Sequence, residues 1–252
     1  MPRATLYVIP GSHPAMAVRR MLEHKGIEYR RVDMLPVISH AVLFALRFPG
    51  TTVPSLRLDG EKLTGSREIS KALDRIQPEP ALFPSDPAER VAVEDAERWA
   101  EEVPQRAVRR ILWQAFKRSP DSMRSYTAGA RLGIPVGLAI KTAAPIIAAE
   151  FRMHGINDTR VRDDLAALPG MLKRIDDWIA DGTLGGTTAA DFQVAGSIRL
   201  AMTLDDLRPH IEGRPAGEHA LRLIPEYPGR VPPVLPEAWL QPLAAAASAP
   251  SA

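Results

Sequence analysis

A proline-rich stretch at residues 77–87 divides the sequence into two parts with different patterns. The stretch holds four prolines and has no hydrophobic periodicity, which is typical of a linker between domains. Before it, short β-prone runs alternate with helical patterns, whereas the apolar residues after it recur mostly at helical spacing. The sequence therefore predicts an α/β domain over residues 1–77 and an all-helical domain over residues 88–240.

The first 34 residues have the pattern of a strand, a helix and a second strand. The run Ala4–Ile9 is β-prone and is followed by a Pro-Gly pair, as expected for a strand that enters a turn. Apolar residues recur at helical spacing over residues 15–22, and Gly26 is expected to end this helix. A second β-prone run lies within residues 27–34.

The rest of the first part predicts a hairpin between two helical segments. Residues 37–48 are interpreted as a helix or a packed irregular segment. The alternation in Val53–Leu58 predicts a strand, and Asp59-Gly60 is a tight-turn signal before the partner strand. A helix is expected from Ser66, with a buried stripe of three apolar residues: Ile69, Leu73 and Ile76. Parallel pairing followed by a hairpin, with helices between, predicts a thioredoxin-like sandwich.

The second part is expected to contain four long helices and one short one. The long helices are Ala88–Trp113 with a kink at Pro104, Arg124–Phe151, Thr159–Ala180 and Ala189–Met202. The short helix is expected near Pro215–Leu223. The Ala- and Ser-rich tail, residues 241–252, is predicted to be disordered.

Composition narrows the possible functions. The 32 basic and 30 acidic residues nearly balance, so no nucleic-acid partner is indicated. The absence of cysteine excludes disulfides, thiolate metal sites and cysteine nucleophiles. The six histidines show no metal-ligand spacing, so no metal site is expected.

The longest apolar stretch, Gly133–Ala149, does not predict a membrane span. It is interrupted by Pro135, Lys141 and Pro145 and is shorter than the ~20 apolar residues that a span needs. We interpret it as a buried helix, and a binding surface is the alternative. The residues after Met1 lead directly into a β-prone run without the pattern of a secretory signal, so a cytoplasmic location is expected.

Three segments carry a resemblance to a known family. They are LYVIPGSHPAMAVRRMLEHKGIEYRRVDM, TVPSLRLDGEKLTGSREISKAL and TTAADFQVA. Together they resemble the glutathione S-transferases over roughly residues 5–204. The resemblance implies a thioredoxin-like thiol-binding domain, a helical C-terminal domain, a homodimer and a role in detoxification.

Ser12 is the predicted catalytic residue. It lies five residues after Tyr7, an arrangement similar to the serine-type (theta and zeta) classes, and this leaves Tyr7 as a core or groove residue. A hydroxyl ahead of a helix start can stabilise a thiolate through a hydrogen bond and the positive end of the helix. The alternative is that Ser12 only caps the helix.

The resemblance implies that Val53, Pro54, Gly65 and Ser66 bind the thiol. The Val53–Pro54 bond is expected to be cis, with the Val53 backbone holding the peptide thiol like an added strand; an ordinary trans bond is the alternative. Ser66, which otherwise is a simple helix cap, is expected to receive the γ-glutamyl carboxylate. Family members commonly carry Glu, Asp or Gln where this chain has Gly65. The thiol is therefore predicted to be glutathione or another low-molecular-weight thiol.

Several further residues have two interpretations. Thr188 and Asp191 fit a capping box, which is structural. A basic face is expected to be solvated or to receive an acidic substrate: Arg106, Arg109 and Arg110. Three aromatic residues line the pocket of the electrophile or belong to the core: Trp113, Phe116 and Tyr126. His13 follows Ser12, but no Gly-x-Ser-x-Gly motif supports a hydrolase pair.

These observations predict a transferase in which a thiolate attacks a small electrophilic substrate. Two alternatives stay open. One is a thiol-dependent isomerase similar to the zeta class. The other is a non-catalytic protein of the same fold that binds hydrophobic ligands.

Overall fold

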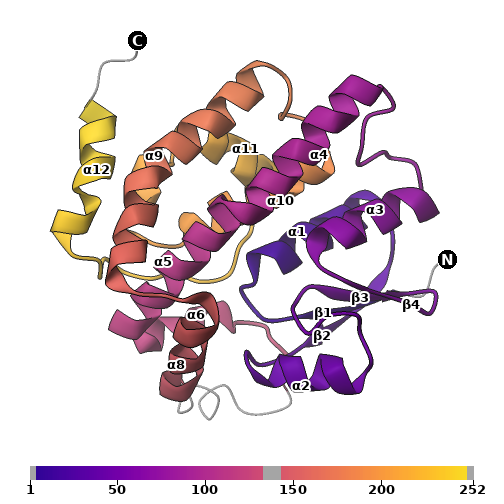
Figure 1. Ribbon diagram of the computed structural model, residues 1–252, viewed down its shortest axis with the longest axis horizontal. Coiled ribbons are helices and arrows are strands. Elements are labelled where there is room, and N and C mark those ends of the chain that lie inside the picture. The colour runs from indigo at the N-terminus through magenta and orange to yellow at the C-terminus, as the bar shows by residue number, and fades with distance from the viewer. Residues whose placement is uncertain (1–3, 133–142, 249–252) are drawn as a thin grey trace.

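The computed structural model describes residues 4–132 and 143–248. Its first part is a mixed four-stranded sheet with three helices (Figure 1). In chain order these are β1 (Ala4–Val8), α1 (His13–His24), β2 (Tyr29–Asp33), α2 (Ile38–Ala45), β3 (Ser55–Leu58), β4 (Glu61–Thr64) and α3 (Ser66–Ile76). The strand order is β2-β1-β3-β4; β1 and β2 are parallel, and the other pairs are antiparallel.

Helices cover both faces of this sheet. Figure 1 shows α1 and α3 on one side and α2 on the other. A small separate core lies on the α2 side: Tyr7, Met34, Leu43 and Phe48. The hairpin turn forms as predicted, with positive φ values of 48° at Asp59 and 94° at Gly60, because a two-residue turn of this hand needs both residues in the left-handed region. The predicted thioredoxin-like architecture is confirmed.

The second part is helical. Its α-helices are α4 (Pro87–Glu102), α5 (Pro104–Arg118), α6 (Met123–Tyr126), α8 (Ala143–His154), α9 (Asp158–Ala180), α10 (Ala189–Ala201), α11 (Pro215–Leu223) and α12 (Glu237–Ser248). Two 3-10 turns accompany them, Pro120–Ser122 and Arg208–His210. The predicted capping box at Thr188 and Asp191 begins α10.

Helix α10 joins the two parts. Every residue of α10 is buried, and α10 packs on α1, α4, α5 and α11. A side chain at Gly196 would meet the carbonyl oxygen of His13 at 2.7 Å, so a glycine lets α10 approach the start of α1. The position of that start is therefore fixed by the helical part of the chain.

Three expectations about the helices, and one about the C-terminal tail, differ from the structure. Pro104 begins a new helix instead of kinking one, because Val103 leaves the helical conformation at φ −110° and ψ −80°. The helix predicted over Arg124–Phe151 is interrupted, because residues 127–132 are not helical. Ile76 is 37% exposed because it lies at the last turn of α3, beyond the packed stripe.

The tail expected to be disordered from residue 241 is instead helical through Ser248, in α12. Leu243 is buried there against the main core, which explains why an Ala-rich segment is ordered. Residues 249–252 and the 133–142 part of the long apolar stretch lie outside the described residues, whereas Ala143–Ala149 belongs to α8. Within the described ranges, none of the helices has the length and apolar character of a membrane span.

Candidate active site

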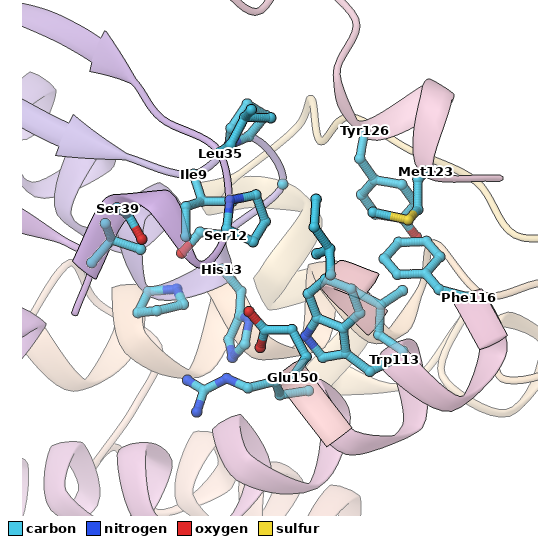
Figure 2. A pocket seen from close by; sticks show the side chains of 18 of the residues that line it. Ile9, Ser12, His13, Leu35, Ser39, Trp113, Phe116, Met123, Tyr126 and Glu150 are labelled. Carbon is cyan, nitrogen blue, oxygen red and sulfur yellow. The ribbon is translucent and has the colours of Figure 1, made fainter. Parts of the chain in front are cut away.

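A cavity of about 400 Å³ lies between the two parts of the chain. The turn after β1 and the region of α2 form one side of it, and α5, α6 and α8 form the other. Figure 2 shows Ile9, Ser12, Leu35 and Ser39 facing Trp113, Phe116, Met123 and Tyr126 across this space. The lining is mostly apolar, with Arg109, Glu150 and three histidines among the exceptions.

Ser12 lies at the mouth of α1 and lines the cavity. Gly11 makes the turn at a φ of 76°, and the Ser12 backbone N–H donates to the Ile9 carbonyl at 3.0 Å. The Ser12 hydroxyl oxygen accepts from the backbone N–H of Ala15 at a long 3.4 Å. Among the described residues its hydroxyl hydrogen has no acceptor, so this proton is available to a group in the cavity.

Two tyrosines from the helical part hold this turn. The Tyr227 hydroxyl donates to the Gly11 carbonyl at 2.8 Å. The Tyr126 ring lies so close that a side chain at Gly11 would meet it at 2.8 Å, and the Tyr126 hydroxyl is hydrogen-bonded to Thr203 at 2.6 Å. Burial raises the pKa of both phenols, so both act as neutral groups.

Of the predicted thiol-binding residues, Val53 lines the same cavity as Ser12. The Val53–Pro54 peptide bond is cis, as the resemblance implies. The Pro54 carbonyl accepts from the backbone N–H of Gly65 at 2.9 Å. The segment just before β3, which carries the predicted thiol-binding backbone, is thereby tied to the start of α3.

Gly65 and Ser66 lie at the N-terminus of α3, outside the residues that line the cavity. Gly65 has a φ of 96°, and a side chain there would meet nothing within 4 Å. Ser66 is buried, and its hydroxyl has no hydrogen-bond partner among the described residues. A buried hydroxyl without a partner is unfavourable, so a ligand acceptor at this place would be stabilised.

The histidine next to Ser12 does not form a hydrolase pair with it. His13 Nε2 lies 3.2 Å from the carbonyl oxygen of Gln105. Burial, and then the charge of Arg109, hold the pKa of His13 well below its ordinary value of 6.5. His13 is therefore a neutral, structurally engaged group in the cavity wall.

The expected basic face on α5 is not a single solvated surface. Arg106 is exposed, and Arg110 forms two hydrogen bonds of 2.6 Å with Asp164. Arg109 lines the cavity. The expectation of a solvated face is wrong because successive residues of a helix point in different directions.

The aromatic residues line the cavity as one of their two interpretations predicts. The Trp113 and Phe116 rings are 5.4 Å apart, and the Phe116 and Tyr126 rings are 5.0 Å apart, both edge to face. These residues are also nearly fully buried, so the same side chains serve core and pocket. Within the described residues no group of acidic or histidine side chains could hold a metal ion.

Comparison with known proteins identifies the first part of the chain. Residues 6–81 match the family model for the glutathione S-transferase N-terminal domain. The match covers the thioredoxin-like part of the chain and not the helical part. No curated protein sequence matches the chain significantly.

Solved structures extend the similarity to the whole glutathione S-transferase fold. Glutathione transferase F7 from Populus trichocarpa is 14% identical with a TM-score of 0.59, over 96% of this chain and 98% of that one. A glutathione S-transferase from Rhodospirillum rubrum is 18% identical with a TM-score of 0.53, over 95% and 99%. One from Methylobacterium radiotolerans, in complex with glutathione sulfonate, is 19% identical with a TM-score of 0.51, over 88% of both chains.

Four residues of this site were not found from the sequence: His40, Glu150, His154 and Tyr227. Tyr227 lies 216 residues from the glycine that it contacts, and no local pattern indicates such a contact. Glu150 and His154 are spaced i,i+4, which is a usable signal for a shared helix face. The arrangement brings a hydroxyl donor, a helix start and an apolar chamber together, which suits an anion attached to an apolar partner.

Proposed function

We propose that this chain is a glutathione S-transferase-like enzyme in which Ser12 stabilises the thiolate of a small peptide thiol. The thiolate attacks an electrophilic carbon of a second, largely apolar substrate. The observation that carries the proposal is the Ser12 hydroxyl, whose hydrogen has no acceptor among the described residues, at the mouth of α1 on a cavity of about 400 Å³.

The energetics of thiol activation fit this site. A free thiol has a pKa of about 8.5, so only a few per cent is thiolate at neutral pH. One hydrogen bond to a charged group contributes ~1.5–3 kcal/mol, and the positive end of a helix adds ~0.3–1 kcal/mol. At ~1.4 kcal/mol per pH unit, Ser12 and α1 together can lower the thiol pKa by about one to three units, to about 7 or below.

Glutathione is the thiol that we propose first. The Val53 backbone at the cavity wall suits the peptide part of the molecule, and the Ser66 hydroxyl lacks a partner among the described residues where a γ-glutamyl carboxylate would bind. The similar structure that contains glutathione sulfonate supports this choice. Gly65 provides no side chain for the amino end, so another low-molecular-weight thiol is the alternative.

The decisive experiment titrates small thiols against the protein and follows thiolate absorbance near neutral pH. The wild-type chain should lower the pKa of glutathione by about one to two units, and Ser12→Gly should abolish this effect. Glycine remains a fair helix cap, so Ser12→Gly separates thiolate stabilisation from capping, and Ser12→Thr keeps both. If no thiol shows a lowered pKa that depends on Ser12, the proposal is wrong.

The choice of electrophile decides between the related activities. Attack on an aryl halide that depends on Ser12 supports the transferase. Turnover of a cis-dienoic diketone alone would indicate a thiol-dependent isomerase. Binding of apolar ligands without any thiol dependence would indicate a non-catalytic binding protein.

The proposal includes a cytoplasmic homodimer that acts in detoxification. An apolar patch on and around α2 supports the dimer, since Phe44 is 77% exposed and Ile38 is 55% exposed. Exposed apolar patches of this kind mark interaction surfaces. Sedimentation should give twice the chain mass of 27.6 kDa; a single-chain mass would contradict the dimer.

A further inference from the structure

A charged group interrupts the apolar wall that the helical domain contributes to the cavity. Arg109 projects from α5, and Glu150 and His154 project from α8. The neighbours of these residues in the wall are apolar, among them Leu112, Trp113 and Ile146. The polar group thus lies in the chamber proposed for the second substrate.

Within the described residues, Arg109 makes no hydrogen bond or ion pair through its guanidinium. Its neighbour Arg110 is fully engaged by Asp164, with two contacts of 2.6 Å. Burial is the main cause of a lowered pKa at Arg109, ahead of the opposing effect of Glu150. Arg109 is partly exposed and lines the open cavity, so its N–H donors are accessible to an anion there.

Glu150 does not take the place of that partner. Its carboxylate lies 3.0 Å from His154 Nε2 and forms no ion pair with Arg109. Figure 2 shows the Glu150 side chain pointing into the pocket between His13 and Trp113. The wall therefore presents one guanidinium with donors available, next to a carboxylate that already has a contact of its own.

We propose that Arg109 binds the carboxylate of an aromatic electrophile and thereby directs its reactive carbon toward the thiol at Ser12. The planar guanidinium matches a single carboxylate with two parallel hydrogen bonds, whereas a phosphate would call for more positive charge than one arginine supplies. The apolar residues of the same wall then contact the ring. This substrate class rests on the proposed function, because it assumes a thiolate at Ser12.

Binding without any thiol is the first test. Calorimetry compares 1-naphthoate with 1-naphthamide, which have the same ring and differ in charge. The wild-type chain should bind the carboxylate more tightly, and Arg109→Gln should weaken naphthoate binding about 10- to 100-fold while leaving naphthamide nearly unchanged. Arg106→Gln, which removes an exposed arginine from the same helix, should change neither, and Arg109→Lys should retain part of the preference.

Kinetics with glutathione form the second test. With 4-chloro-3-nitrobenzoate the thiolate sulfur forms a bond to the carbon that carries chlorine, and chloride leaves with the electron pair of the broken bond. Arg109→Gln should lower kcat/KM for this substrate about tenfold or more relative to 4-chloro-3-nitrobenzamide. If neither compound reacts while naphthoate still binds through Arg109, the proposed transferase fails and the carboxylate site stands.

Three results would overturn the carboxylate site. The first is a wild-type chain without preference for naphthoate over naphthamide. The second is an equal loss of both ligands in Arg109→Gln, with a native circular dichroism spectrum. The third is an Arg109→Gln variant that binds naphthoate normally but loses binding of S-methylglutathione, an unreactive analogue of the thiol. That result would assign Arg109 to the thiol and not to the second substrate.

Discussion

Glu97, on α4, is a buried carboxyl group that links the stability of the fold to pH. It is 0% exposed and faces α3, where the Ser70 hydroxyl donates to its Oε1 at 2.7 Å. The nearest cation is Arg67, at 3.8 Å, and the Oε2 of Glu97 has no hydrogen-bond partner among the described residues. Burial therefore dominates and raises the pKa of Glu97 from 4.5 to about 7.

The sign follows from the proton balance of the two states. Between pH 4.5 and about 7 the folded chain holds a proton that the unfolded chain has lost, so stability falls as pH rises through this window. At ~1.4 kcal/mol per pH unit, the full effect is roughly 3 kcal/mol. It is absent below this window and complete above it.

Glu97→Gln should remove this dependence, because glutamine stays neutral and can still accept from Ser70. Relative to the wild type, the variant should gain roughly 3 kcal/mol of unfolding free energy between pH 4.5 and pH 8. Urea unfolding followed by tryptophan fluorescence at several pH values measures it. Glu101→Gln is the matched control, since Glu101 lies on the same helix, is about a third exposed and faces the same Arg67. If wild-type and Glu97→Gln curves run parallel over this range, the assigned burial effect is wrong.

Two substitutions test how the helical part positions Ser12. Tyr227→Phe removes the hydrogen bond to Gly11. The variant should lose ~0.5–1.5 kcal/mol of stability, and the Ser12-dependent lowering of the thiol pKa should become smaller. Unfolding and thiolate titrations measure these two effects, with Tyr29→Phe as the control. Gly196→Ala would bring a methyl group within 2.7 Å of the His13 carbonyl and should destabilise the chain by ~1–3 kcal/mol. Gly170→Ala in α9, where nothing lies within 4 Å, should be neutral or stabilising in the same thermal unfolding assay.

The parts of the fold that the sequence predicts well are set by adjacent residues. Asp59 and Gly60 fix their turn through two positive φ angles, and Thr188 and Asp191 satisfy each other's backbone groups at the start of α10. Each of these features needs only a few consecutive residues to be recognised. The thioredoxin-like order of elements follows from the same kind of local pattern.

The parts that the sequence does not predict depend on contacts between distant segments. Whether Arg109 is solvated or lines a cavity depends on where α8 lies against α5, and periodicity alone does not determine that. Tyr227 contacts the Gly11 turn only because the segment after α11 returns to it. The ordered α12 likewise depends on Leu243 reaching the core, although its composition is typical of a disordered tail.

The two interpretations of Ser12 are compatible once the roles of its hydroxyl are separated. As a helix cap, the oxygen accepts a hydrogen bond from Ala15, and at 3.4 Å this bond is weak. Stabilising a thiolate instead uses the hydroxyl as a donor, and a hydroxyl can donate and accept at once. The residue therefore need not give up its structural role to act on a thiol. For the same reason, loss of stability in Ser12→Ala would say nothing about catalysis, and only the thiol pKa in Ser12→Gly separates the two roles.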